Sequence, residues 1–509
     1  MISIKEIVLN FLYYTEGDSL IFTQVSFWVF FSVLLAGYTF VYNRPVIRSA
    51  YLLVFSLFFY FKSSGLFFSL LLFSTLVDYS IGLAISKSNS KLSRKLLVAL
   101  SVFVNLLVLS YFKYAYFFVD IINNVFGTNL TVVNHLALWG NALISTKFDT
   151  ATIVLPVGIS FYTFQTISYT VDVYRGKVAA VRNIIDFAFY VSFFPQLVAG
   201  PIVRAAEFIP QIYRRYDLSK NEFGHALYLI LTGLVKKMVI SDYLSVNFVD
   251  RVFDNPLSYT GFENLMATYG YAMQIYCDFS GYTDIAIGLA LLLGFKLPIN
   301  FNSPYKATSL TDFWHRWHIS LSSWLRDYLY IPLGGNRKGR LRTYINLLIT
   351  MLLGGLWHGA HLKFVVWGGI HGIGLAIEKL LSNFRLANIN GERRTAHLIW
   401  GIITFNVVSL SWIFFRANDF TSAIAMLHQI FKDFNFNTVS NIIIAYSDIF
   451  LILVLGYLVH LLPFDVKEFI RGKFISMPLA VKLLTTLIVI ITLIQIQNIE
   501  LKPFIYFRF

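Results

Sequence analysis

Long apolar runs recur along this chain from about residue 21 to residue 497, separated by short polar stretches. After a first run, FTQVSFWVFFSVLLAGYTFVY, further runs lie at roughly 50–86 and 96–119, from 151 onward, and at roughly 184–202, 224–240, 264–294, 343–384, 396–415, 447–463 and 478–497. Runs of this length and apolarity are typical of helices that cross a bilayer. The pattern therefore predicts an all-α, polytopic transmembrane fold with about eleven to thirteen spanning or re-entrant helices around a central tunnel.

The composition agrees with the apolar runs. Hydrophobic residues make up 57% of the 509 residues and charged residues only 13%, and the mean hydropathy is +0.65. No polar block of domain size remains between the runs, so we expect one integral membrane domain over residues 1–509, with residues 498–509 as a C-terminal tail. The chain shows no internal repeat, which disfavours a transporter built from inverted halves.

The basic residues indicate how the chain is oriented. The net charge is +14, and the stretches KSNSKLSRK (87–95) and NRKGRLR (336–342) each carry four basic and no acidic residues. Residues 121–146 contain no charged residue, whereas VKEFIRGK (466–473), before the last apolar run, is basic. Because basic loops stay in the cytoplasm, we expect a multi-pass protein of the inner membrane with its C-terminus outside. No basic patch with stacking aromatic residues indicates a nucleic acid, although a basic cytoplasmic face suits an acidic partner.

Cysteine chemistry and a cleaved leader are both disfavoured. Cys277 is the only cysteine, so the chain forms no internal disulfide and holds no cysteine metal cluster. The N-terminal stretch MISIKEIVLN is mixed in character and does not resemble a signal peptide.

Five of the ten histidines fall between residues 315 and 371, where ionisable groups in an apolar setting are costly. The stretch SLTDFWHRWHISLSSWLRDYLYIPLGG predicts one helix that begins at Ser309, with Asp312 three residues on, and ends near Pro332. The expected polar face holds His315, His318, Ser322 and Arg326, and the expected aromatic face holds Phe313, Trp317, Leu321, Trp324 and Tyr328. A histidine face turned inward suits a reaction chamber within the membrane.

The second histidine cluster is TMLLGGLWHGAHLKFVVWGGIHG. Its glycines Gly354, Gly355 and Gly359 allow a ligand or another helix to approach the backbone around His358. For His361 and His371, a hydrogen bond across a helix interface explains the residue equally well. The pairs His315/His318 and His358/His361 have the i, i+3 spacing of metal ligands, but only Asp312 lies nearby to complete a site, so we expect no metal.

The two histidine stretches resemble the membrane-bound O-acyltransferase (MBOAT) family. The residues that carry the resemblance are FWHRWHISLSSWLRDYLYIPLGGNRKG and, about twenty residues later, GGLWHGA. Within the family they are most similar to the membrane subunit of alginate O-acetyltransferase and its peptidoglycan O-acetylating relatives, and more distantly to the D-alanyl transfer protein of teichoic acid modification. Further similar stretches lie at 155–176, 193–204, 274–295 and 411–419, so the resemblance covers roughly residues 30–420. One departure is His315, where the alginate-type pattern has arginine.

The resemblance implies a reaction and residues that carry it out. His358 in LWHG matches the family's invariant histidine, and His318 in WHIS matches the second essential one. Family members move an acyl group from a cytoplasmic thioester, such as acetyl-CoA or an acyl carrier protein, to a hydroxyl through a tunnel, with no bound cofactor. An imidazole suits the role of general base, and a second one can hold the carbonyl oxygen or orient the first. We assign the tunnel and substrate contacts to His315, Ser322, Arg326, Trp317, Trp357 and Asp278.

The last six residues, FIYFRF, carry a second resemblance. A small companion protein of the D-alanyl transfer system ends in F-x-Y-x-x-F, and Phe504, Tyr506 and Phe509 reproduce this pattern. By analogy, we expect Tyr506 to carry the acyl group as an ester while Phe504 and Phe509 anchor the tail. A phenol is a good relay because it leaves more readily than a sugar hydroxyl. The alternative is that these aromatic residues lie in the membrane interface.

Together these observations predict an enzyme, an O-acyltransferase that moves acyl, most simply acetyl, groups outward. The expected acceptor is an envelope or extracellular polysaccharide, reached through an extracytoplasmic acyltransferase partner. The alternatives are a non-enzymatic channel or carrier for a small anion, with the histidines as a proton relay, and a membrane anchor for a secretion complex.

Overall fold

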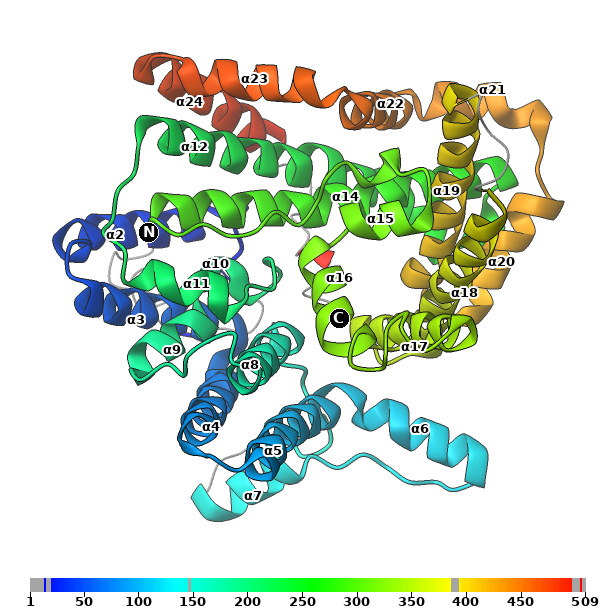
Figure 1. The fold of residues 1–509 in the computed structure, drawn as a ribbon. Coiled ribbons are helices and arrows are strands. Elements are labelled where there is room, and N and C mark those ends of the chain that lie inside the picture. Colours follow the sequence, from blue (N-terminus) through cyan, green and yellow to red (C-terminus); the bar gives the residue numbers. More distant parts are fainter. Residues whose placement is uncertain (1–12, 15–19, 145–147, 386–392, 497–503, 506–509) are drawn as a thin grey trace.

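Every regular element that the structure describes is a helix (Figure 1). The computed structural model describes residues 13–14, 20–144, 148–385, 393–496 and 504–505. Six helices in these ranges are long and apolar enough to cross a membrane, and two bent helix pairs raise the number to as many as eight. The remaining apolar runs form shorter helices. The prediction of an all-α, polytopic membrane fold is confirmed.

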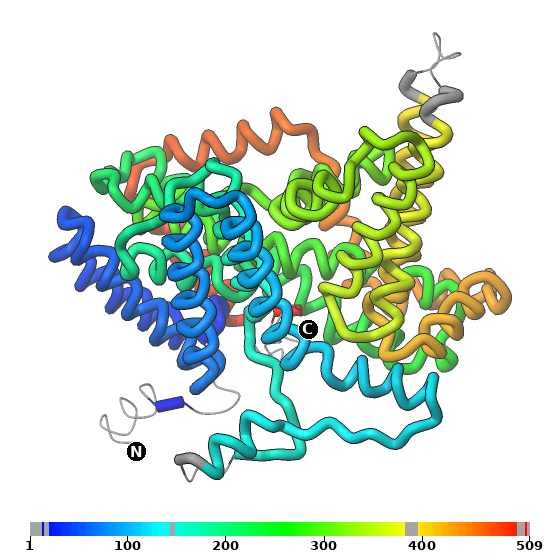
Figure 2. Tube along the Cα trace, turned by 60° about the horizontal axis from the view of Figure 1, so that its bottom comes forward, coloured from blue at the N-terminus to red at the C-terminus, as the bar shows by residue number. Residues whose placement is uncertain are grey.

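The first part of the chain forms one side of the molecule. Its elements are α2 (Val25–Val41), α3 (Pro45–Ser64), η1 (Gly65–Phe67), α4 (Phe68–Lys87), α5 (Lys91–Leu109), η2 (Ser110–Tyr114), α6 (Ala115–Phe126) and α7 (His135–Ile144). Figures 1 and 2 both place α6 and α7 at the edge of the molecule, away from its centre. The basic stretch 87–95 is mostly helical, because only residues 88–90 separate α4 from α5.

The middle of the chain supplies the core. Its elements are α8 (Ile159–Tyr174), α9 (Ile184–Ser192), α10 (Phe194–Leu197), α11 (Ala205–Ile212), α12 (Lys220–Val235), η3 (Lys236–Asp242), η4 (Ser245–Val249), α13 (Asp250–Asp254), η5 (Pro256–Ser258) and α14 (Gly261–Leu292). Of the most apolar part of α14, 83% is buried, so α14 is an internal helix. Its start is fixed by a capping box, in which Thr260 and Glu263 exchange side-chain and backbone hydrogen bonds.

The last part of the chain carries both histidine clusters. Its elements are η6 (Pro304–Lys306), α15 (Leu310–Arg316), α16 (Ile319–Leu325), η7 (Arg326–Tyr330), α17 (Arg340–His358), α18 (Leu362–Arg385), α19 (Arg393–Arg416), α20 (Phe420–Lys432), η8 (Phe436–Thr438), α21 (Val439–Ala445), α22 (Ser447–Leu461), α23 (Phe464–Ser476) and α24 (Leu479–Ile496). The chain turns by 115° between α23 and α24. The short elements η2, η3, η4 and η7 are π-helical turns.

Glycines let α12 and α14 pack closely. A Cβ added at Gly233 would lie 2.6 Å from the carbonyl oxygen of Gly281, and one added at Gly281 would lie 2.8 Å from that of Gly233. About two helical turns further along α14, a Cβ at Gly288 would lie 2.7 Å from the carbonyl oxygen of Ala226. Small residues at such positions bring two membrane helices into backbone contact.

A second glycine seam joins α17 to α18, next to the GGLWHG motif. A Cβ at Gly355 would lie 2.2 Å from the carbonyl oxygen of Phe364, and one at Gly368 would lie 2.2 Å from that of Met351. The prediction that glycines allow another helix to approach the backbone near His358 is confirmed.

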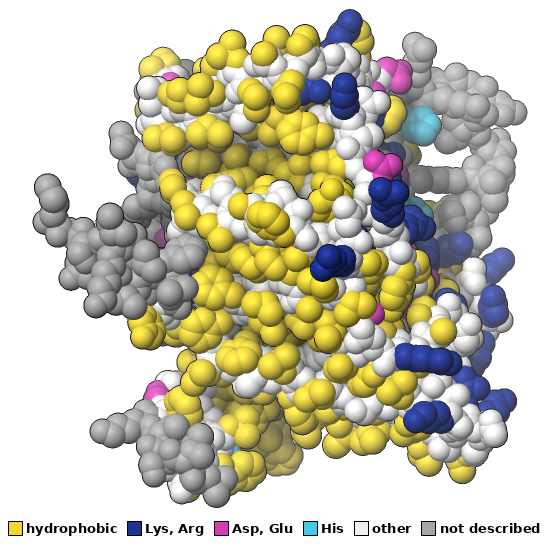
Figure 3. Space-filling view, turned by 90° about the vertical axis from the view of Figure 1, so that its left-hand side faces the viewer, with side chains coloured by type: hydrophobic (Ala, Val, Ile, Leu, Met, Phe, Trp, Pro, Cys, Tyr) yellow, Lys and Arg dark blue, Asp and Glu magenta, His cyan; other side chains and the backbone are white. Residues whose placement is uncertain are grey.

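The outer surface is that of a membrane protein. Along α5, the side chains of Leu92, Leu96, Leu100, Phe103 and Leu107 are exposed at intervals of three or four residues, so one face of this helix is apolar and open. Figure 3 shows a face covered largely by hydrophobic side chains, with Lys and Arg gathered along one edge. Apolar surface of this extent is stable in contact with lipid and would be unfavourable in water.

Substitution of Gly355 by alanine should loosen the α17–α18 contact and destabilise the protein. The added methyl group overlaps a backbone oxygen that cannot rotate away, and overpacking of this kind typically costs about 1–3 kcal/mol. We expect a lower midpoint of thermal unfolding in detergent. Gly369→Ala is the matched control, because its Cβ would meet only the Leu352 side chain, at 3.6 Å. Equal stability of the two variants would contradict the tight seam.

Candidate active site

The first histidine motif contains a break in the helix at His318. The predicted cap at Ser309 is present, since its side chain accepts a hydrogen bond from the backbone of Asp312 at 3.0 Å. However, α15 ends at Arg316, and His318 has a left-handed backbone with φ of 43°. Such a conformation is uncommon outside glycine and is often found at functional sites. The prediction of one continuous helix with His315 and His318 on a shared face is therefore wrong.

The break turns His318 into the interior, where its side chain is 0% exposed. The ring nitrogen Nδ1 lies 3.2 Å from Oδ1 of Asn300. That oxygen also accepts a hydrogen bond from the backbone N–H of Ser320 at 3.1 Å, which identifies it as an acceptor. In the neutral ring, Nδ1 therefore carries the proton and Nε2 carries the lone pair. His318 is thus held in the tautomer that can accept a hydrogen bond at Nε2.

His358 ends α17 and is 3% exposed. Its imidazole has aromatic neighbours on several sides, with ring centroids 5.0 Å from Trp357 and 5.2 Å from both Trp367 and Phe415, all edge-to-face. These large rings come from α17, α18 and α19, so three helices define the position of the imidazole. Close aromatic packing of this kind limits rotation of the ring and excludes water.

Trp357 and Phe161 connect the two histidines. The ring of Trp357 lies 6.2 Å from that of His318 and 5.0 Å from that of His358, and the ring of Phe161 lies 5.3 Å from Trp357. We call the four side chains of His318, His358, Trp357 and Phe161 together the histidine chamber.

Lys113 and Tyr114, in η2, hold the C-terminal end of α17. The Lys113 ammonium donates to the carbonyl oxygens of Trp357 and His358 at 2.8 and 3.2 Å, and the Tyr114 hydroxyl donates to that of Leu356 at 2.8 Å. These carbonyls are among the last of the helix and have no partner within it. A cation at this end is also favoured by the helix dipole. Lys113 additionally lines a narrow cavity with His358 and Ser160.

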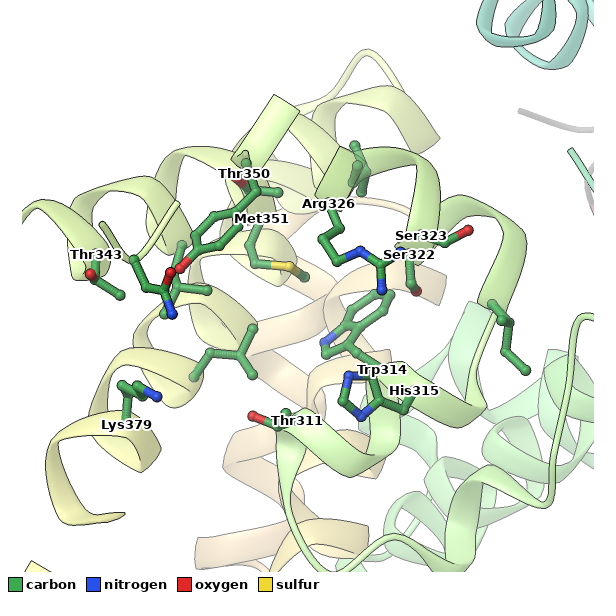
Figure 4. Close-up of a pocket in the computed structure, with 16 residues that line it drawn as sticks. Thr311, Trp314, His315, Ser322, Ser323, Arg326, Thr343, Thr350, Met351 and Lys379 are labelled. Atoms are coloured by element: carbon green, nitrogen blue, oxygen red, sulfur yellow. The ribbon is translucent and has the colours of Figure 1, made fainter. Parts of the chain in front are cut away.

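A cavity of about 360 Å³ lies next to the chamber, among α15, α16, α17 and α18. Figure 4 shows His315, Trp314 and Arg326 on one side of this cavity and Lys379 and Thr343 on the other. Ile319, which follows His318, and Met351, about two turns before His358, also line the cavity. We call this space the basic cavity, because His315, Arg326 and Lys379 bring positive or protonatable groups to it.

The basic cavity lies beside the stretch NRKGRLR. Asn336, from this stretch, lines the cavity, and an adjoining space of about 270 Å³ is lined by Arg340 and Lys379 among others. At the same rim, partial burial would raise the pKa of the Asp327 carboxyl, but hydrogen bonds from Arg326 and Arg204 outweigh burial and lower the pKa. Asp327 therefore stays charged at neutral pH and forms ion pairs with both arginines, at 2.7 Å each.

The C-terminal tail returns to the interior at Phe504 and Ile505. The Phe504 side chain is 1% exposed, and the backbone N–H of Ile505 donates to Oδ2 of Asp278 at 2.8 Å. The other oxygen of Asp278 forms an ion pair with Lys237 at 2.6 Å. Phe279, the next residue on α14, has its ring 4.6 Å from that of His318. The tail therefore binds α14 at Asp278, and the next residue of this helix, Phe279, contacts the chamber residue His318.

The structure distributes the predicted site residues over four places. His318, His358 and Trp357 form the chamber, whereas His315, Ser322 and Arg326 line the basic cavity. Asp278 and Phe504 meet at the tail, and Trp317 is packed in the core against Phe301 and Trp412, at 5.1 Å from each ring. Tyr506 and Phe509 lie outside the described residues. The roles assigned to all these residues remain predictions.

The other two histidines of the clusters have structural contacts. His371 lies 3.0 Å from the hydroxyl of Ser411 on the neighbouring helix α19, as expected for an interface residue. His361 accepts a hydrogen bond from the backbone of Lys363. Among the residues that the structure describes, no three His, Cys, Asp or Glu side chains gather as metal ligands would.

Sequence reasoning missed Lys113, Lys237 and Asn300. The two lysines stand within the apolar stretches LSYFKYAYFF and TGLVKKMVI, and lysine at such positions is a recognised signal of function. Asn300 gave no comparable signal, because its contact with His318 depends on a loop that the sequence pattern does not define.

Known proteins share this chain's motifs. Residues 179–417, which include both chamber histidines, match the profile of MBOAT, the membrane-bound O-acyltransferase family. Over 370 residues the chain is 43% identical to the probable alginate O-acetylase AlgI of Pseudomonas aeruginosa, covering 71% of this chain and 66% of that protein. The chain is 36% identical over 411 residues to the peptidoglycan O-acetyltransferase of Helicobacter pylori, covering 76% and 74% of the two chains.

A more distant relative is the teichoic acid D-alanyltransferase of Bacillus subtilis, which is 27% identical over 282 residues, 52% of this chain and 69% of that protein. The aligned part of this chain thus spans about two thirds to three quarters of each of these relatives. The resemblance seen in the two histidine motifs is confirmed, and this chain belongs to the membrane-bound O-acyltransferase family.

Proposed function

We propose that this acyltransferase moves an acetyl group from a cytoplasmic thioester to the outer side of the membrane, for O-acetylation of an envelope or extracellular polysaccharide. The observation that carries the proposal is the chamber itself, in which two buried imidazoles lie between a basic cavity and the docked tail. The names of the relatives, alginate O-acetylase and peptidoglycan O-acetyltransferase, support acetyl as the group and a polysaccharide as the acceptor.

The basic cavity is the place for the donor. Acetyl-CoA and acyl carrier proteins both present a phosphate-bearing arm that ends in the thioester, and phosphates favour arginine and lysine. Arg326 and Lys379 stand at the exposed rim, while Ile319 and Met351 give the inner part an apolar lining. A donor that enters beside NRKGRLR would therefore bind through its phosphates and direct its acyl end toward the chamber.

The chamber residues divide the chemistry. The acceptor hydroxyl attacks the thioester carbonyl carbon while His358 takes its proton, the C–S bond then breaks, and the leaving thiolate receives that proton. His318, held by Asn300 with its proton on Nδ1, orients the reacting groups through Nε2. The Trp357 indole N–H is buried and has no acceptor in the part of the chain that the structure describes, which suits it to bind the carbonyl oxygen.

The first acceptor in this scheme is Tyr506. Ile505 is held at Asp278, and consecutive Cα atoms are only about 3.8 Å apart, so the tail enters the region of the chamber directly before Tyr506. Acetyl transfer to the phenol gives an ester that is reactive enough to be passed on. An extracytoplasmic partner would then transfer the acetyl group to a polysaccharide hydroxyl and regenerate the phenol.

Replacement of His358 by alanine should lower acetyl transfer by a factor of about 10²–10⁴, the usual contribution of a general base. His318→Ala should be similarly impaired. The measurement is transfer of radiolabelled acetyl from the thioester by purified protein in vesicles, with His371→Ala as the control histidine. If His358→Ala transferred acetyl at the normal rate, a channel or carrier function would become the better explanation.

Lys379→Glu should weaken donor binding without impairing the chemical step. A reversed charge at the cavity rim should raise the KM for the thioester donor about three- to tenfold at low salt and leave kcat nearly unchanged. Lys432→Glu, on α20 and outside the basic cavity, makes the same change in net charge and serves as the control. Identical KM values for both variants would exclude the cavity as the donor site.

A labelled acetyl donor should leave its acetyl group on the tail. After incubation with the donor, mass analysis of the C-terminal peptide should find the label on Tyr506 of the native chain. Tyr506→Phe and His358→Ala should both lack the label, since one removes the acceptor and the other the base. An unlabelled native tail during active polymer acetylation would exclude the tyrosyl relay.

A further inference from the structure

A buried cluster of three charged side chains lies beside the chamber and outside the chemistry described above. Lys237 forms ion pairs with Asp278 at 2.6 Å and with Asp242 at 2.8 Å, and each of the three side chains is at most 6% exposed. Buried ion pairs are weak evidence for stability, because desolvation of the charges offsets much of their attraction. A cluster of this kind in an apolar bundle therefore points to a function.

The π-helical turn η3 assembles the cluster. Lys237 and Asp242 are five residues apart, which would place them about 140° apart around an α-helix of 3.6 residues per turn. The wider π-turn brings residues i and i+5 together, and η3 covers both positions. Asp278 comes from α14, which the Gly233–Gly281 seam holds against this region. The π-helical turn η3 and the close packing of α14 therefore bring the carboxylates of Asp242 and Asp278 to the ammonium group of Lys237.

The tail contributes further partners to the cluster. Oδ2 of Asp278 accepts the backbone N–H of Ile505 at 2.8 Å, and the Lys237 ammonium lies 4.6 Å from the centre of the Phe504 ring. The same ring packs edge-to-face on Tyr282, at 4.8 Å, and near Phe22, at 6.4 Å. The Phe504 ring therefore contacts Lys237 and Tyr282, and the backbone N–H of the next residue, Ile505, binds Asp278.

We propose that Lys237, Asp242 and Asp278, together with Tyr282 and Phe22, form a docking site for the chain's own C-terminal segment. The ligand it recognises is an aromatic side chain followed by a backbone N–H. Asp278 and Lys237 are positioning residues, since they hold the tail beside the chamber and do not touch the reacting atoms. The docking stands on the contacts themselves, whereas its use in acetyl transfer rests on the function proposed above.

Two features favour the tail over a purely structural role for the cluster. The two carboxylates outnumber the single ammonium, so Asp278 can accept a further donor, and the amide of Ile505 fills that position. A cation over an aromatic face is worth most where both are shielded from water, which is the case for Lys237 and Phe504. A cluster that served only to join α14 to η3 would need neither contact.

The test is hydrogen–deuterium exchange of the full-length protein, read at the amide of Ile505. Asp278→Ala removes the acceptor but leaves the Lys237–Asp242 ion pair, so the helices keep a balanced pair of charges. We expect exchange at Ile505 to become at least about tenfold faster in Asp278→Ala and in Phe504→Ala. Asp278→Asn keeps an oxygen acceptor and should retain most of the protection.

Asp284→Ala is the matched control. This change removes the neighbouring ion pair between Lys236 and Asp284, 2.6 Å long, which joins the same two elements. Its exchange at Ile505 should equal that of the native chain. Equal protection in Asp278→Ala and in the native chain, or equal loss in Asp284→Ala and Asp278→Ala, would overturn the docking site.

Acetyl labelling of the same variants separates docking from relay. Tyr506→Phe should keep the slow exchange at Ile505 and lose the label, whereas Asp278→Ala should lose both. Normal docking in a native chain whose tail is never labelled would leave the docking site standing and remove the relay. Full labelling of Tyr506 in Asp278→Ala would overturn the positioning role of Asp278.

Discussion

The constraint behind this structure is that every charge enclosed by an apolar bundle needs a partner at hydrogen-bonding distance. Water cannot supply that partner inside the membrane, and an isolated buried charge costs several kcal/mol. Lys113 meets the constraint with the carbonyl oxygens of Trp357 and His358, and Lys237 with two carboxylates. Arg48 likewise donates to the carbonyl oxygens of Ile212 and Arg214. The contacts of Lys113 and Arg48 and the Lys237–Asp278 pair join distant parts of the chain, so satisfying these charges also fixes the tertiary arrangement.

Irregular helix geometry supplies the partners. Lys113 lies in the π-turn η2, Lys237 and Asp242 in η3, and Arg326 in η7. In a π-helical turn, side chains point in directions that differ from those of a regular α-helix. Such turns are often found at functional sites. The left-handed residue His318 has the same effect at the start of α16. The glycine seams on α14 and α17 provide the regular, closely packed framework that these irregular turns require.

The outcome is an ordered series of environments. The basic cavity is wide and partly exposed, the histidine chamber is aromatic and buried, and the docking site of the tail is buried and charged. In the proposed function, these three places receive a phosphate-bearing donor, a reacting acyl group and a peptide tail, which need different surroundings. Removal of water around the chamber also protects an activated acyl group from hydrolysis. In the function proposed above, this arrangement keeps donor and acceptor apart until they react.

The membrane class, the all-helical fold, the two histidine motifs and the family could all be predicted from the sequence, because they depend on local composition, periodicity and short motifs. The cap at Ser309 and the glycine contacts near His358 were likewise predictable from neighbouring residues. The different surroundings of His315 and His318 became apparent only in the folded chain, since helical periodicity fails where the backbone enters the left-handed region. Only the tertiary structure, too, paired Asp278 with Ile505, 227 residues away. A contact between residues so far apart in the sequence depends on how the whole chain packs, and no periodic pattern of residues in the sequence indicates it.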